Sequence, residues 1–198
     1  MSPRITISYN RFLDPIFTKA YQVDNPEHIP MEDGLLFEKV EIFREEWKKQ
    51  KSAILAGMKN TLGLEFYPNT IDVSIVRALR GGFSSPLTIS ALVPTERFVD
   101  VLTHELLHVL ITDSTSASGI GLIRKKLYGN VEPRLTRNHI LVHAAHQDIY
   151  LNVLNDPKRL ADDIKKCERN PAYKKAWDIV EERGCQNILD EFKAKVKA

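Results

Sequence analysis

Long apolar runs are missing from this sequence of 198 residues. No run approaches the 18 or more apolar residues that a helix needs to span a bilayer. The first residues, 1–7, also lack the apolar core of a signal peptide. We therefore expect a cytoplasmic protein with no membrane partner.

Net charge and cysteine are scarce as well. Lysine and arginine total 28 against 26 acidic residues, a net charge of +2, which gives no electrostatic support for a nucleic-acid partner. The two cysteines, Cys167 and Cys185, lie in the charged C-terminal third, away from the histidines. We expect reduced structural thiols, because no secretion signal accompanies them. Nothing in the sequence indicates an oligomeric state.

The hydrophobic pattern predicts an α+β fold. Residues 4–10 alternate as a half-buried strand does, and residues 35–62 repeat apolar positions at helical spacing. Further strands are expected at residues 71–75 and 87–91, before a helix that begins at Thr95. This order predicts a small, mostly antiparallel sheet with a long backing helix.

Length and composition favour one core with a small appendage. We predict a main domain over residues 1–155. Residues 156–198 read as helices that start at Pro157 and Pro171. They are expected to form a helical C-terminal extension packed on the same domain.

The helix expected after Thr95 carries the pattern His104-Glu105-x-x-His108. Residues four apart lie on one face of a helix, so both imidazoles can reach one metal ion such as zinc. Glu105 lies beside that site, where a carboxylate can take a proton from a metal-activated water molecule. The pattern arises by accident in about one chain in a hundred of this length, so its helical context matters.

A polar segment, residues 114–118, is expected to end the motif helix as a loop. Gly119 and Gly121 follow it and would keep the region flexible. The segment is interpreted as a plain connection, with a rim or lid over the site as the alternative.

A second group of histidines follows on a helical stretch that opens near Pro133 and runs to about Asn155. His139, His143 and His146 are spaced by four and three residues, which places them on one helix face. A histidine on an apolar face is usually a hydrogen-bonded core residue. Three together, downstream of a two-histidine motif that lacks a third ligand, favour a metal site.

The two helices together resemble those of the zincin metallopeptidases, and the strands before the motif are similar to the gluzincin branch. In that branch the second helix carries Asn-Glu-x-x-x-Asp, where the glutamate binds zinc. Here the stretch begins Asn138-His139 and reaches His143. If this stretch is aligned with the family pattern position by position (a strict register), His139 takes the place of the glutamate and is the third ligand. A looser one makes it His143, which we prefer narrowly because it is central; His146 is third.

Glu132 is a weaker candidate for the third ligand, since it precedes Pro133 at the helix entrance. The resemblance implies a zinc-dependent hydrolase, a metallopeptidase with a peptide or protein substrate. It also implies that an extended peptide pairs with an edge strand, which we expect at residues 87–91. Tyr150, His146 and His139 are candidate donors to the oxyanion of the transition state.

Two rival interpretations stay open. The first is a catalytically inert zinc-binding interaction module, in which His104, His108 and two second-helix histidines close the metal shell. Glu105 argues against it, because a structural zinc site has no use for that carboxylate. The second is an accidental motif with no metal.

Overall fold

The computed structural model describes residues 2–114 and 117–197. It confirms the α+β class, with a small four-stranded sheet and many helices in that part of the chain. The chain divides into two compact units, residues 1–51 with 68–109 and residues 52–67 with 110–198. The boundary predicted at residue 155 coincides with neither unit's limits and stays a prediction.

The first unit holds the sheet and most of the motif helix. Its elements are β1 (Arg4–Tyr9), α1 (Asp14–Asp24), the first part of α2 (Asp33–Leu62), β2 (Thr70–Val76), β3 (Gly82–Ser84), β4 (Leu87–Ser90) and most of α3 (Thr95–Thr112). The strand order is β1-β2-β4-β3. The predicted strands and the long helix are therefore present at the expected places.

The expectation of a mostly antiparallel sheet is wrong. β1 pairs with β2 and β2 with β4 in parallel, and only β3 pairs with β4 in the antiparallel sense. The physical reason is the crossover: α1 and α2 intervene between β1 and β2, and strands joined through a helix can return in parallel. The β3–β4 pair is a short hairpin, which makes it antiparallel.

The edge strands are β1 and β3, whereas we expected residues 87–91 to form an edge strand. β4 pairs with β2 on one side and with β3 on the other, so its backbone lies inside the sheet. All four residues of β4 are buried. An added peptide strand would therefore have to pair with β1 or β3, and not with β4.

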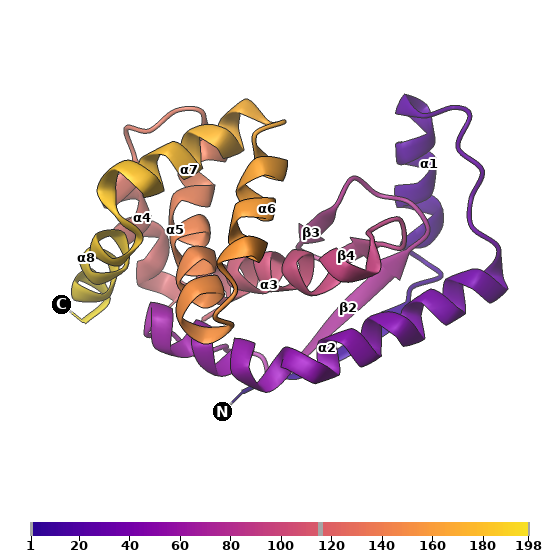
Figure 1. Ribbon diagram of the computed structural model, residues 1–198, viewed down its shortest axis with the longest axis horizontal. Coiled ribbons are helices and arrows are strands. Elements are labelled where there is room, and N and C mark those ends of the chain that lie inside the picture. The colour runs from indigo at the N-terminus through magenta and orange to yellow at the C-terminus, as the bar shows by residue number, and fades with distance from the viewer. Residues whose placement is uncertain (1, 115–116, 198) are drawn as a thin grey trace. The chain divides into compact units, whose positions relative to one another are not determined.

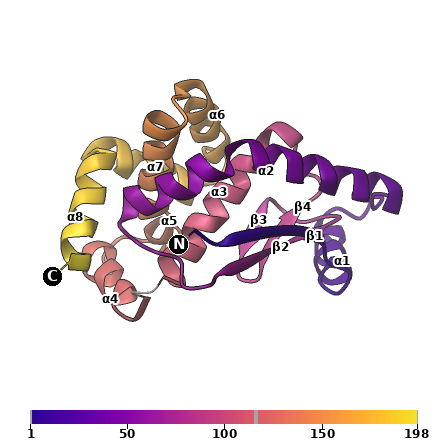
Figure 2. The same cartoon turned by 90° about the horizontal axis from the view of Figure 1, so that it is seen from below.

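Helices α2 and α3 pack together along the sheet (Figure 2). The rings of Phe43 on α2 and Phe98 on α3 stack at 3.9 Å between centroids, with both side chains fully buried. The Arg44 side chain also donates a 2.7 Å hydrogen bond to the carbonyl oxygen of Ile7 in β1. The aromatic stacking holds the motif helix against α2, and the charge-assisted bond holds α2 against the sheet.

Helix α1 was not predicted, because its outer face is apolar and its periodicity weak: Ile16 and Val23 are exposed. A buried carboxylate at its start holds it in place. Asp14 accepts hydrogen bonds from the Tyr9 hydroxyl at 2.8 Å and the Arg77 backbone N–H at 2.6 Å. Burial alone would raise the pKa of Asp14, but these donors and the Arg77 guanidinium lower it below its ordinary value.

The second unit is helical and is built around α5. Its elements are the end of α2, α4 (Ala117–Tyr128), α5 (Arg134–Asp148), the π-helical turn η1 (Ile149–Val153), α6 (Pro157–Cys167), α7 (Pro171–Arg183) and α8 (Cys185–Lys197). α7 packs against both α5 and α6 (Figure 1). The Thr136 hydroxyl on α5 donates to the carbonyl oxygen of Ala172 on α7 at 2.9 Å.

The loop expected after the motif helix is only partly tested. Residues 115 and 116 lie outside the described residues, and Ser114 forms an isolated antiparallel bridge with Phe66. Gly119 and Gly121, which we took as a source of flexibility, lie inside α4. The flexibility expected at these glycines is therefore wrong, since their backbone is committed to helical hydrogen bonds, and the rim or lid stays an untested alternative.

The helices are amphipathic. The longest, α2, spans 30 residues and alternates buried apolar positions with charged ones such as Glu46 and Lys49, which pair at 2.6 Å. Across the described ranges, no helix combines the length and the apolar character needed to cross a membrane.

Candidate metal centre

Helix α3 presents the motif by burying its opposite face. Phe98, Leu102 and Leu106 follow one another at four-residue spacing and are fully buried. Four-residue spacing also places His104 one turn from His108, and both side chains are only partly buried. The helix begins at Thr95, as its start signal predicted.

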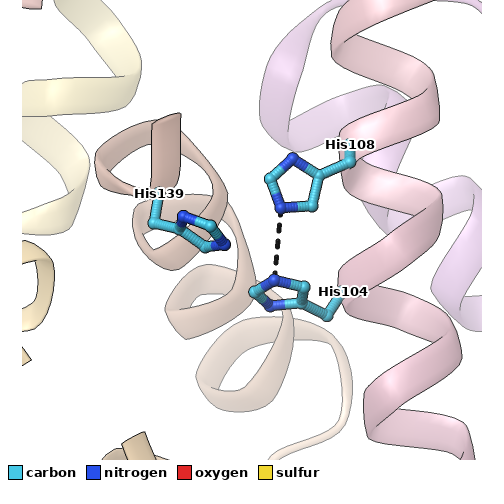
Figure 3. A group of neighbouring side chains, drawn as sticks. All are labelled: His104, His108 and His139. Carbon is cyan, nitrogen blue, oxygen red and sulfur yellow. Dashed lines mark hydrogen bonds between the residues drawn. The ribbon is translucent and has the colours of Figure 1, made fainter. Parts of the chain in front are cut away.

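The two motif histidines converge on one point. Their Nε2 atoms lie 3.2 Å apart, and the ring planes are inclined by 64° (Figure 3). Two nitrogens that bind one tetrahedral zinc ion at about 2.0–2.1 Å are separated by about 3.3 Å. The spacing in the structure therefore fits two ligands of a single ion.

The third member of the group is His139 on α5. Ligand atoms of His104, His108 and His139 all lie within 4.8 Å of one another (Figure 3), so the three histidines are close enough to bind a metal ion. This is the residue that the strict register selects. It is not His143, the residue that we preferred narrowly.

The backbone of α5 fixes the tautomer of His139. Its Nδ1 lies 2.8 Å from the carbonyl oxygen of Leu135. Because a carbonyl can only accept, we assign the proton to Nδ1, which leaves the Nε2 lone pair for a metal. Burial lowers the pKa of His139, and the charge of Arg124 lowers it further. The imidazole is thus held neutral, as a metal ligand must be.

His143 lies in an aromatic cluster instead. It is fully buried, and its ring stacks on the Trp177 indole at 4.4 Å with an interplanar angle of 13°. Tyr173, on the same helix as Trp177, meets the His143 ring edge to face and lies 4.3 Å from the His139 ring. Trp177 and Tyr173 have no spacing relation to the histidines, so sequence patterns could not identify them.

His146 and Tyr150 also lie outside the three-histidine group. Nδ1 of His146 is 3.7 Å from a carboxylate oxygen of Asp163, a buried residue of α6, and its ring stacks on Tyr150 at 4.4 Å. Tyr150 itself is fully buried, in the π-helical turn, with the Arg159 guanidinium 5.7 Å from its ring centroid. The catalytic role of Tyr150 stays a prediction.

Glu105 follows His104 and is buried, with 8% of its surface exposed. Burial raises the pKa of Glu105 to about 8 in the metal-free protein, because its charged form is poorly solvated. A carboxyl group in this range can both take and return a proton near neutral pH. Its state also responds to charge nearby, since a cation within about 6 Å favours the carboxylate.

This pKa predicts how the stability of the metal-free protein depends on pH. The unfolded chain loses the Glu105 proton near pH 4.5 and the folded chain only near pH 8. The folded state thus binds more protons between these values, so its stability falls as pH rises from about 5 to 8. Urea unfolding should show a loss on the order of 3 kcal/mol in wild type that Glu105→Gln lacks. Equal slopes would contradict the buried, protonated carboxyl group.

Strand β3 lies against Glu105 at Gly82. A methyl group placed on Gly82 would lie 2.7 Å from Oε1 and 2.8 Å from Cγ of Glu105, and 3.0 Å from Val101. These distances are below any normal contact between carbon and its neighbours. Glycine at this position therefore makes the room that the Glu105 side chain occupies.

We expect Gly82→Ala to displace Glu105. If Glu105 is the general base, kcat for hydrolysis should fall about 10- to 100-fold, because a shift of about 1 Å in a reacting group is that costly. Zinc affinity, measured by competition with a chelator, should stay within a few-fold. Gly34→Ala is the matched control, since a methyl group there meets nothing within 4 Å.

A stability measurement tests the same contact without turnover. Gly82→Ala should destabilise the protein less in a Glu105→Ala background than in wild type, because the Glu105 side-chain atoms that the new methyl group would meet are absent. Additive effects of the two substitutions would show that Gly82 does not constrain Glu105.

No protein-family model, curated protein sequence or solved structure matches this chain. The resemblance to zincins is therefore carried by the residues of α3 and α5 alone.

Proposed function

We propose that the protein is a zinc-dependent hydrolase, and that it is a metallopeptidase. One observation carries the proposal: three histidine ligand atoms lie within 4.8 Å of one another, and the residue after the first of them is a buried glutamate. Three neutral imidazoles with a neighbouring carboxylate are the donor set of a hydrolytic zinc site.

The number of ligands favours an open site over a closed one. Among the described residues, the group that can hold an ion consists of His104, His108 and His139. A structural zinc site normally closes with four protein ligands, whereas a catalytic one keeps a position for water. This supports the enzyme over the inert zinc-binding module.

Zinc at these histidines would acidify a water molecule and polarise the carbonyl group of a substrate. Glu105 takes a proton from the attacking water as its oxygen bonds to the carbonyl carbon. When the carbon–nitrogen bond breaks, Glu105 returns that proton to the leaving amine. The charge of a bound cation would favour the carboxylate form of Glu105, which is the form that can act as the base.

The peptide substrate is placed along β3 in this proposal. β3 is one of the two edge strands, and its Gly82 abuts Glu105 within the first unit. An extended peptide that adds to a sheet edge forms main-chain hydrogen bonds and needs close backbone approach, which glycine permits. A strand added at β3 would bring its peptide bonds near the Glu105 carboxylate.

The test is metal content together with hydrolysis. We expect protein purified without added zinc to contain about one zinc per chain, and to cleave members of a quenched fluorescent peptide library. Removal of the metal with 1,10-phenanthroline should abolish cleavage, and added zinc should restore it. Bound zinc without any cleavage would support the inert module instead, and absence of bound metal between pH 7 and 8 would overturn both.

A further inference from the structure

A small cationic cavity lies between α4 with the residue that follows it and the first turns of α5, within the second unit. Its volume is about 280 Å³, and its lining consists of Gly121, Arg124, Lys125, Gly129, Arg137 and Asn138. Pockets for whole small molecules are usually 300–1,000 Å³. This cavity is therefore of a size for one chemical group of a larger ligand.

Positive charge in this cavity is poorly balanced. Arg124 donates from Nη2 to the Asn138 side-chain oxygen at 3.1 Å, and in the described part of the chain no carboxylate pairs with it. Arg137 donates to the carbonyl oxygen of Gly129 at 2.9 Å and pairs with Glu132 at 3.2 Å, but the Glu132 side chain is 71% exposed. An exposed partner of this kind contributes little.

Arg124 is half-buried, and its side chain bonds to neutral oxygens of Asn138. Burial lowers the pKa of Arg124, and the charges of Arg137 and Arg134 lower it further. Buried charges in proteins are normally paired. A bound anion would supply the missing partner, and a guanidinium group offers parallel N–H donors that match the two oxygens of a carboxylate.

Asn138 connects the cavity to the metal centre. It lines the cavity, orients Arg124 through its side-chain oxygen, and directly precedes His139 in α5. We propose that this cavity binds the free C-terminal carboxylate of a peptide substrate, an assignment that rests on the proposed function. The C-terminal carboxylate is the one anion that every unmodified peptide carries, and Asn138 of the cavity directly precedes His139 of the three-histidine group. The protein would then cleave peptides close to their C-terminus.

The first arm of the test is binding and needs no turnover. NMR spectra of the zinc-loaded full chain are titrated with sodium acetate and, separately, with inorganic phosphate, at ionic strength held constant with sodium chloride. Acetate should cause saturable shifts of the Asn138 side-chain amide and the Arg124 Nε–H in wild type. The amide shift should need about 10- to 100-fold more acetate in Arg124→Gln. Lys126→Gln is the matched control: it lies on α4, is exposed and does not line the cavity.

Lys125→Gln is the second variant, in case Arg124→Gln does not fold. Lys125 is exposed and lines the cavity, so its loss should weaken acetate binding several-fold without harming the fold. The absence of a saturable shift in wild type would overturn the site. So would acetate titrations of Arg124→Gln and Lys125→Gln that match the titration of wild type. Saturable binding of phosphate without binding of acetate would overturn the carboxylate assignment.

The second arm compares peptides with a free and an amidated C-terminus. Wild type and Lys126→Gln should cleave the free acid with at least about 10-fold higher kcat/KM, mostly through a lower KM. Arg124→Gln should lose this preference, because its kcat/KM for the free acid falls towards that for the amidated peptide. Equal cleavage of both peptides by wild type would overturn the assignment. Acetate binding at Arg124 in a protein that cleaves no peptide would overturn the proposed function and the peptide assignment, but support the anion site.

Discussion

Glu105→Gln is expected to lower kcat for peptide hydrolysis by about 10²- to 10⁴-fold, which is the usual contribution of a general base. Glutamine has the same shape and fills the space beside Gly82, but it cannot take a proton. Residue 105 is not a member of the three-histidine group, so zinc content should stay at the wild-type level. Steady-state kinetics and metal analysis of the same preparation measure both quantities.

The control for this substitution is Glu96→Gln, on the same helix. Glu96 is exposed in the first turn of α3, so the change removes one charge without touching the histidines. Its kcat should equal that of wild type. Activity of Glu105→Gln within a few-fold of wild type would remove Glu105 from the reaction, and loss of zinc would show that its effect is structural.

Helical periodicity and start signals were sufficient to locate the long helix α2 and the motif helix α3. Residues 35–62 were predicted from their apolar repeat and form α2, and the motif helix starts at the predicted Thr95. Each of these signals is local, because capping, periodicity and proline positions act within one helix. The sheet depends on pairing between distant strands, and its parallel direction could not be read from alternation within residues 71–75 or 87–91.

The crossover rule could have corrected the sheet. A long helix between two strands permits parallel pairing, and β1 and β2 are separated by α1 and α2. Alternation of apolar residues suggested antiparallel strands, but in β2 and β4 nearly every residue is buried. Strands buried on both faces are typical of parallel pairing.

The third ligand could not be chosen from spacing. His139, His143 and His146 share one face of α5, so the sequence gives all three nearly the same direction. Tertiary contacts separate them: Trp177 stacks on His143, and Asp163 and Tyr150 contact His146. These partners come from α6, α7 and the π-helical turn, and nothing in the spacing of the histidines predicts them. The two motif histidines needed no such contact, because one helix fixes their geometry.

Substitution of His139 should release the metal, and the same substitution at His143 should not. We expect His139→Phe to weaken zinc binding by well over 100-fold, more than the 10- to 100-fold typical of residues that only support a ligand. Phenylalanine keeps a ring of similar size but has no nitrogen to bind the ion. His143→Phe should keep zinc affinity within about tenfold of wild type and retain the stack on Trp177.

Competition with a chromophoric zinc chelator measures both affinities, and unfolding in urea checks that each variant is folded. The comparison is sharp because the two variants carry the same chemical change one turn apart on α5, and both positions are buried. His139 is distinguished by the 2.8 Å contact of its Nδ1 with Leu135, which leaves Nε2 for the metal, and by its place in the three-histidine group. Greater loss of zinc from His143→Phe than from His139→Phe would make His143 the ligand, and equal losses in two folded variants would indicate a closed site with four histidines.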